Sequence, residues 1–208
     1  MAEIPSWTRN VERSGGYWSD GRWYDLHADR RLPLVQPMRD ELVLALPPLP
    51  EGTLVGDVAC GTGQASDALL AAYPGVRVVL LDQDPDLLDR ACTKVEGRAA
   101  NAQRRVVKIA ADGSPLPGGP YAVLVASLAL HAIVGHDGDR TEAETRYTRL
   151  LRGCHRSLAP GGHLLVGDHV GTLPLFAQLK AMERAGFTDV DCAWRQDDFF
   201  VAGGRVGD

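Results

Sequence analysis

The sequence predicts an α/β fold, a doubly wound, mixed sheet of seven strands with helices on both faces. From residue 54 onward, short apolar runs rich in Val and Leu alternate with helical segments. Strands joined by helices indicate a parallel sheet with right-handed crossovers. The runs lack strict polar–apolar alternation, which is typical of strands buried on both faces. The last stretch holds two strands around a short polar turn, so the sheet should end in an antiparallel hairpin.

Each core element follows from its own run of residues. In chain order these are a strand at residues 53–59, a helix at 63–73, a strand at 77–82, a helix at 85–97, strands at 105–111 and 121–127, a helix at 143–158 and a strand at 162–169. Asp84 before Pro85 is an N-cap with proline at the first helical position. The glycines of residues 159–162 end the long helix. A further helix ends near Gly186, and residues 187–205 form the hairpin.

The first fifty residues differ in character from the core. They contain a cluster of aromatic residues among Gly, Ser and Arg, namely Trp7, Tyr17, Trp18, Trp23 and Tyr24. A helix is predicted to begin near Pro37 and to end at Pro47, because proline cannot continue a helix. We expect residues 1–50 to belong to the same unit as the core at residues 51–208.

Composition excludes several classes of protein. The chain has 208 residues, 45% of them hydrophobic, and a net charge of -5, as expected for one globular domain with no nucleic-acid partner. It has no apolar run of membrane-spanning length and no hydrophobic signal segment, which favours a cytoplasmic protein without a membrane partner. The four cysteines form no C-x-x-C pair and the six histidines no H-x-x-x-H pair, so we expect no metal site.

The stretch VGDVACGTGQ, residues 55–64, places Asp57 in a buried strand just before a turn with two glycines. Such a turn exposes backbone N–H groups to a ligand. It falls one residue short of the G-x-G-x-x-G dinucleotide pattern, and Asp82 has the spacing of a ribose-binding acid. A nicotinamide cofactor is therefore one interpretation. Asp57 favours another, because a carboxylate there repels a pyrophosphate and attracts the cationic amino-acid end of S-adenosylmethionine (SAM).

Several segments together resemble the class I SAM-dependent methyltransferases, which have a Rossmann-like fold. VGDVACGTGQ is similar to their first motif, VVLLDQDPDLLDRA to the second and AADGSPLP to the third. LHAI and LLRGCHRSLAPGGHLLVGDH resemble the exit of the fourth strand and the entry to the fifth, and residues 181–205 resemble the terminal strands. The resemblance covers roughly residues 54–205, and it implies a transferase that uses SAM as its cofactor.

The resemblance also implies which residues contact the cofactor: Tyr24, Asp57, Ala59, Gly61, Gly63, Asp82, Gln83, Asp112, Gly113, Ser127 and Leu128. Asp57 and the turn would hold the methionine end, and Asp82 would accept both ribose hydroxyls. Asp112 would lie near the adenine, although its sequence also fits a plain turn. Ala59 stands where the family has its first glycine, and we expect a negative φ there, at which alanine costs little.

Two histidines are candidate catalytic bases. A protonated oxygen or nitrogen acceptor needs a base, and histidine titrates near neutral pH. His131 follows the fourth strand and His169 ends the fifth, beside Asp168, at the edge where open α/β sheets bind ligands. Each also fits a contact to the cofactor or to a neighbouring loop.

The N-terminal aromatic residues are predicted to form a lid. Tyr24 and Asp25 resemble a segment that folds across the cofactor in related small-molecule methyltransferases. Trp18, Trp23 and Tyr24 could also enclose the acceptor, because aromatic faces exclude water and attract a sulfonium. Trp7 and Tyr17 more simply pack the helix against the sheet.

The predicted activity is methyl transfer from SAM to an oxygen or nitrogen of a small soluble molecule. The fourth strand is followed by no N/D-P-P-Y/F stretch and no Pro-Cys pair, which disfavours methylation of adenine, glutamine or cytosine. Two alternatives stay open: an NAD(P)-dependent oxidoreductase on a Rossmann fold, and a non-catalytic SAM-binding protein. We expect a monomer or a homodimer.

Overall fold

The structure, a computed structural model, describes residues 20–98, 102–135, 137–171 and 173–207. Among the N-terminal aromatic residues, Trp7, Tyr17 and Trp18 lie outside these ranges, so the full lid and the packing role of Trp7 and Tyr17 stay predictions. The division into a segment at residues 1–50 and a core at 51–208 likewise stays a prediction. None of the helices in the described ranges combines the length and the apolar character that a membrane crossing requires.

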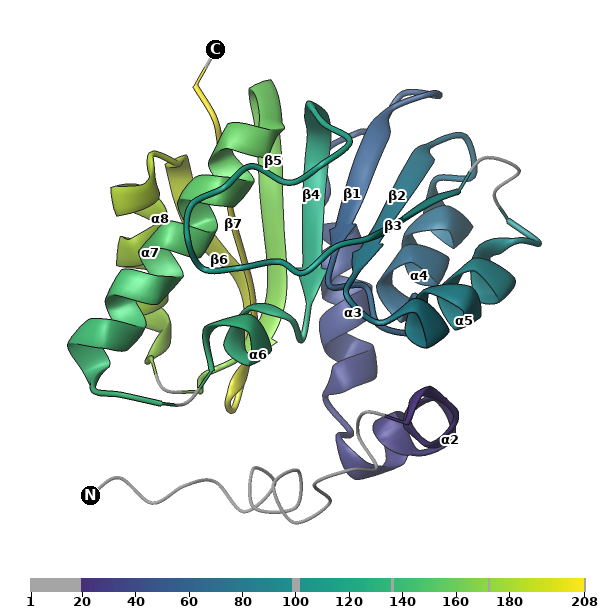
Figure 1. Cartoon of the computed structure of the whole chain (residues 1–208), viewed down its shortest axis with the longest axis horizontal. Helices are drawn as coiled ribbons and strands as arrows, with labels where there is room; N and C mark the ends of the chain where they lie inside the picture. Colours follow the sequence, from purple (N-terminus) through teal and green to yellow (C-terminus); the bar gives the residue numbers. More distant parts are fainter. Residues whose placement is uncertain (1–19, 99–101, 136, 172, 208) are drawn as a thin grey trace.

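Seven strands form one open sheet in the order β3-β2-β1-β4-β5-β7-β6 (Figure 1). The strands are β1 (Leu54–Val58), β2 (Arg77–Asp82), β3 (Gln103–Val106), β4 (Tyr121–Ser127), β5 (Leu158–His169), β6 (Thr188–Gln196) and β7 (Phe199–Arg205). Strands β1 to β5 run parallel to one another. Strand β7 runs antiparallel to both β5 and β6. The predicted fold class, including the C-terminal hairpin, is confirmed.

Helices cover both faces of the sheet, because alternate side chains of the buried strands point to opposite faces. The helices are α2 (Gly21–Arg31), α3 (Val35–Leu44), α4 (Gln64–Ala72), α5 (Pro85–Val95), α6 (Leu130–Val134), α7 (Arg140–Ser157) and α8 (Leu175–Ala185). In β2, Val78 and Leu80 belong to the apolar core that α3, α4 and α5 complete. Val79 and Leu81 belong to the core on the other face, which includes residues of α7 and α8.

The connection from β3 to β4 differs most from the prediction. The strand predicted at residues 105–111 ends at Val106, where the exposed strand β3 lies at the edge of the sheet and has one neighbour. The N–H of Val107 still donates to the Asp82 carbonyl, and the chain then crosses the sheet toward α7 without forming a helix (Figure 1). Residues 107–120 therefore lie elsewhere than a longer β3 would have placed them.

Strands β1 and β4 are neighbours, and the strand order runs outward in both directions from this pair. In a doubly wound sheet the connections diverge at such a point and leave a crevice at the carboxyl ends of the strands. Helix α6, which the sequence did not predict, begins close to the end of β4 at this edge. Helix α2, also not predicted, lies near the same edge (Figure 1).

Candidate functional site

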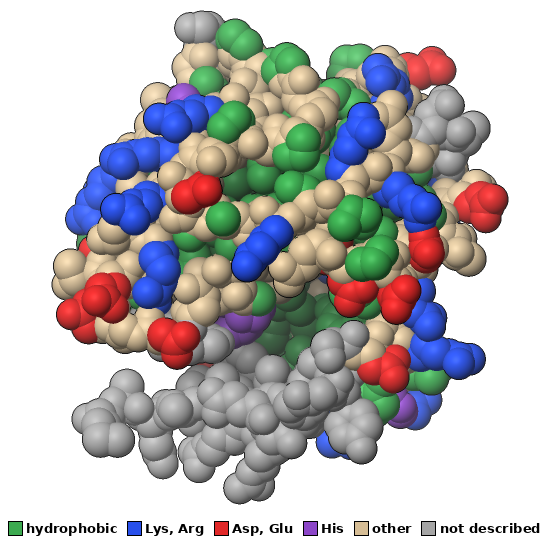
Figure 2. All heavy atoms as spheres, viewed as in Figure 1, with side chains coloured by type: hydrophobic (Ala, Val, Ile, Leu, Met, Phe, Trp, Pro, Cys, Tyr) green, Lys and Arg blue, Asp and Glu red, His purple; other side chains and the backbone are tan. Residues whose placement is uncertain are grey.

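A cavity of about 270 Å³ lies in this crevice, and Figure 2 shows it as a hollow walled by apolar and histidine side chains. Its wall comes from helices α2, α3 and α5, the glycine turn after β1 with the start of α4, the exit of β4 with α6, and the end of β5. Of the residues predicted to bind cofactor or to act as bases, those that line it are Tyr24, Ala59, Gly61, Ser127, Leu128, His131 and His169.

The two glycines of the turn are required for different steric reasons. Gly61 has a φ of +54°, and a Cβ there would meet no atom within 4 Å, so bare backbone faces open space. Gly63 has a φ of +77°, and its Cβ would lie 2.8 Å from the Cβ of Ala91 in α5. Gly61 therefore leaves room for a ligand, whereas Gly63 lets α5 pack against the turn.

Two residues other than glycine in the cavity wall have left-handed backbone. Ala59 has a φ of +51° and Leu128 a φ of +52°. The expectation of a negative φ at Ala59 is wrong, because the chain must reverse sharply between β1 and α4. Each such residue costs about 1–2 kcal/mol, and strain of this kind concentrates at functional sites.

Asp82 braces the glycine turn from behind. Its side chain is buried at the end of β2. One carboxylate oxygen accepts a hydrogen bond from the N–H of Gly61 at 2.8 Å, and the other accepts from the N–H of Asp84 at 3.0 Å. Each oxygen keeps further capacity to accept. The ribose role of Asp82 stays a prediction, as does the adenine role of the neighbouring Gln83, which is exposed.

The structure does not bring Asp112 or Gly113 to the cavity. Asp112 is exposed and accepts a hydrogen bond from the N–H of Ser114, as a turn residue does. The carbonyl of Gly113 accepts from Arg156 of α7. Because the chain leaves the sheet after Val106, these residues lie farther along the crossing than the predicted strand would have put them. This placement gives no support to their assignment to the adenine.

Asp57 lies beneath the turn rather than in the cavity wall. It is 1% exposed, and one carboxylate oxygen accepts a hydrogen bond from the Ser66 hydroxyl at 2.5 Å. Burial raises the pKa of Asp57 to about 6, the Ser66 hydrogen bond opposes this, and the charge of Asp82 adds to it. A role at the methionine end stays a prediction that requires Asp57 to act across Ser66 or through water.

The raised pKa of Asp57 implies that the stability of the protein depends on pH. The folded state binds this proton more tightly than the unfolded state, so the free energy of unfolding falls as pH rises from the ordinary carboxyl pKa of 3.8 to about 6. We expect Asp57→Asn to be more stable than the wild type above pH 6, by up to about 3 kcal/mol at about 1.4 kcal/mol per pH unit. Urea denaturation at pH 7.5 and pH 4.5 measures this, and the advantage should shrink at the lower pH.

Asp40→Asn, at an exposed carboxyl of α3, is the matched control and should show no such advantage. An advantage of Asp57→Asn that does not change with pH would contradict the buried-charge explanation, and so would a loss of stability at pH 7.5.

The structure unites His131, Asp168 and His169 at one wall of the cavity. The Nδ1 atom of His131 lies 2.6 Å from a carboxylate oxygen of Asp168, whose side chain is fully buried. The backbone N–H groups of His131 and His169 also donate to this carboxylate, at 3.2 and 2.8 Å. The two histidine rings lie 4.1 Å apart between centroids. The carboxylate thus fixes the ring of His131 in one orientation.

The pair shifts both pKa values in the directions expected of an ion pair. Burial lowers the pKa of His131, but the charge and hydrogen bond of Asp168 outweigh it and raise the pKa above 6.5. Burial raises the pKa of Asp168, but the charge and hydrogen bond of His131 hold it below its ordinary value. Asp168 therefore stays ionised while His131 titrates.

These three side chains also offer one donor atom each within 4.8 Å of one another, an arrangement that could hold a metal ion. Spacing in the sequence could not reveal it, because His131 and Asp168 are far apart in the chain. Both oxygens of Asp168 already accept N–H donors, which favours orientation of His131 as their purpose. The absence of a metal site stays a prediction.

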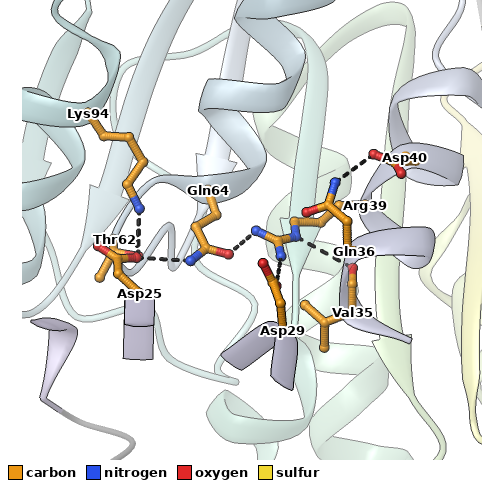
Figure 3. A network of polar contacts seen from close by, with 9 residues as sticks. All are labelled: Asp25, Asp29, Val35, Gln36, Arg39, Asp40, Thr62, Gln64 and Lys94. Atoms are coloured by element: carbon orange, nitrogen blue, oxygen red, sulfur yellow. Dashed lines mark hydrogen bonds and ion pairs between the residues drawn. The ribbon is translucent and has the colours of Figure 1, made fainter. Parts of the chain in front are cut away.

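Arg39 of α3 is a cavity residue that sequence reasoning missed. Its side chain is 7% exposed, and one nitrogen lies 2.5 Å from Asp29. A second nitrogen donates to the side-chain oxygen of Gln64, and the third to the Val35 carbonyl (Figure 3). In the sequence Arg39 is one polar residue in an amphipathic helix, so no local signal marks it as a buried cation.

Known proteins give independent information about this chain. A family model described as "Methyltransferase domain" matches residues 57–164. Trans-aconitate 2-methyltransferase of Streptomyces avermitilis is 29% identical over 164 residues, which cover 78% of this chain and 51% of that protein. The enzyme of the same name from Methylobacterium nodulans is 32% identical over 147 residues, covering 71% and 48%. The chain thus spans about half the length of these relatives.

Solved structures share the fold. An O-methyltransferase family protein from Burkholderia thailandensis superposes with a TM-score of 0.68 at 19% identity, over 94% of this chain and 63% of that one. Human N-acetylserotonin methyltransferase, solved in complex with SAM, superposes with a TM-score of 0.57 at 17% identity, over 89% and 58%. At these identities the likeness is one of fold.

Proposed function

Because the chain belongs to the class I SAM-dependent methyltransferases, the family that its motifs predict, we propose that it transfers a methyl group from SAM to an oxygen or nitrogen of a small acceptor. One observation carries the proposal. A single cavity is lined both by the bare backbone of the glycine turn and by the oriented His131. A cofactor held at the turn and an acceptor held at His131 would meet inside it.

The chain's own residues fit the cofactor. The open space beside Gly61 lets a ligand touch the backbone. Asp82 stands behind that backbone with capacity to accept ribose hydroxyls, and Leu87 and Leu128 add apolar wall. SAM, when bound, supplies an activated methyl group. The protein mainly has to hold the two reactants together and exclude water.

His131 would act as the general base. Because Asp168 engages Nδ1, Nε2 is the nitrogen through which the ring can take the acceptor's proton. The acceptor's O–H or N–H bond breaks as that proton moves to Nε2. SAM held beside Gly61 would supply its methyl group to the acceptor atom, and S-adenosylhomocysteine would be the other product. His131 then loses its proton to solvent.

A carboxylate acceptor is the second candidate. The curated relatives are named for methylation of trans-aconitate, and the cavity wall contains the buried cation Arg39 as well as His131. A carboxylate is already ionised near neutral pH and needs no base. In that case His131, protonated, would bind the acceptor instead of deprotonating it.

Transfer of a labelled methyl group from SAM to a panel of phenols, amines and carboxylic acids, trans-aconitate included, tests the proposal. We expect a product that survives mild alkali, as methyl ethers and methylamines do. An alkali-labile methyl ester would establish the carboxylate alternative. Tight binding of SAM without transfer to any acceptor class would overturn the enzymatic proposal and favour a non-catalytic SAM-binding protein.

A further inference from the structure

Helix α2 covers part of the cavity although it has almost no apolar face of its own. Of its residues only Gly21 and Ala28 are buried. A helix without an apolar stripe gains little from burial and must be held by other contacts. Its contacts to the core therefore decide whether Tyr24, which lines the cavity, stays in place.

Asp25 provides the most extensive of these contacts. Its carboxylate accepts hydrogen bonds from the Thr62 hydroxyl at 2.6 Å, the Gln64 amide at 2.9 Å and the Lys94 ammonium at 2.6 Å (Figure 3). The donors belong to three places, namely the glycine turn, the start of α4 and the last turn of α5. Burial raises the pKa of Asp25, but these donors outweigh it and lower the pKa below 3.8. We call these four residues the Asp25 clasp.

A second contact reinforces the clasp. Gln64 donates to Asp25 through its amide nitrogen and accepts from Arg39 through its amide oxygen. Arg39 in turn pairs with Asp29, one helical turn beyond Asp25 on α2. Figure 3 shows the resulting chain of polar contacts from α5 across the glycine turn to α3.

The clasp shares its residues with the cavity. Thr62 and Gln64 line the cavity and hold α2 at the same time, and Tyr24 adjoins Asp25 in the chain. We call the arrangement with the Asp25 clasp formed closed, and one with α2 moved away from the glycine turn open. A ligand that contacts both the turn and Tyr24 binds the closed arrangement better than the open one. By linkage, ligand binding and closure of α2 must then strengthen each other.

We propose that Asp25 is a positioning residue that latches α2 over the cofactor, so that closure of α2 is coupled to cofactor binding. The inference rests on the SAM site proposed above. If the Asp25 clasp is broken, the form with α2 closed over the cavity is less populated. The apparent affinity for the cofactor then falls in proportion to the population of that form. The rate of cofactor dissociation should change most, because an open α2 no longer blocks the way out.

The test compares Asp25→Asn with Asp86→Asn. Asp86 is exposed and borders the same surface groove as Asp25 and Lys94, so its variant removes an equal charge outside the clasp. Lys94→Ala breaks the clasp from α5 and serves if Asp25→Asn does not fold. Two quantities are measured, the dissociation rate of S-adenosylhomocysteine and its protection of the exposed Arg30 and Arg31 of α2 against trypsin.

We expect S-adenosylhomocysteine to protect α2 in the wild type and in Asp86→Asn. In Asp25→Asn and Lys94→Ala it should dissociate about tenfold faster, and the protection should be lost. The inference is overturned if these two variants match the wild type in dissociation rate and protection. If the wild type binds S-adenosylhomocysteine and is protected by it, while both clasp variants lose this protection, the role of the Asp25 clasp is supported. If the same wild-type protein methylates no acceptor, the proposed enzymatic function fails.

Discussion

Replacement of Asp168 by Asn lowers the rate of methyl transfer by about 10²–10⁴-fold, the contribution of a well-placed general base, while the affinity for SAM stays unchanged. The reason is orientation. Asp168 is fully buried and holds His131 Nδ1 at 2.6 Å, so the ring can present only Nε2 to the acceptor. An amide can instead donate to Nδ1, which would leave the ring in the wrong tautomer.

The pH dependence provides a second signature of the same pair. In the wild type, kcat/KM should rise with pH through the pKa of His131, which Asp168 raises above 6.5, because only the neutral ring accepts a proton. In Asp168→Asn, burial alone acts on His131 and lowers its pKa, so the acidic limb should move to lower pH. A pH–rate profile of both proteins measures this.

His131→Ala should lose the same rate as Asp168→Asn, and the two losses should not add, because they remove one device. His163→Gln, in the middle of β5 and outside the cavity wall, is the matched control. If Asp168→Asn kept full activity and the acidic limb of its pH–rate profile did not move, the proposed role of the His131–Asp168 pair would be contradicted. That result would fit a carboxylate acceptor, which needs no base.

Asp82→Ala should weaken SAM binding by about 1.5–3 kcal/mol, or roughly 10- to 150-fold, the usual worth of hydrogen bonds to a charged group. Asp82 braces the N–H of Gly61 from the end of β2, and the proposal has it accept the ribose hydroxyls as well. Calorimetric titration with S-adenosylhomocysteine measures the loss. The variant should also be slightly less stable, because the turn loses its brace.

Asp112→Ala is the matched control for Asp82→Ala. Asp112 is exposed and lies outside the cavity wall, so we expect its loss to leave the affinity unchanged. A loss equal to that of Asp82 would restore the adenine role that the sequence motif implied. Unchanged affinity in Asp82→Ala would refute the ribose assignment.

The strands were predictable because burial on both faces leaves a continuous apolar run, as in residues 77–82 and 121–127, which match β2 and β4 closely. The bounds of the edge strand β3 were not, because an exposed strand with one neighbour carries no such run. Helix α2 has almost no buried apolar side chains, so its sequence shows no apolar periodicity that would predict a helix. Helix propensity could not place it, since side-chain contacts with distant residues hold it.

The site was predictable only where local geometry leaves a mark in the sequence. The glycine turn did so, and the spacing of Asp82 from the turn agrees with its contact to the N–H of Gly61, while its ribose role stays a prediction. The pairing of His131 with Asp168 and the burial of Arg39 depend on which elements the fold brings together, so no spacing rule contains them. The backbone of Ala59 shows the converse limit, because its residue type suggests ordinary φ while the turn imposes a left-handed one.

The cavity at the glycine turn should receive SAM rather than a dinucleotide. Calorimetric titration of the wild-type chain with S-adenosylhomocysteine, NAD⁺ and NADP⁺ in parallel tests it most directly. We expect saturable heat with S-adenosylhomocysteine at one site per chain and none with either dinucleotide. Binding of a dinucleotide, with no heat from S-adenosylhomocysteine, would contradict it.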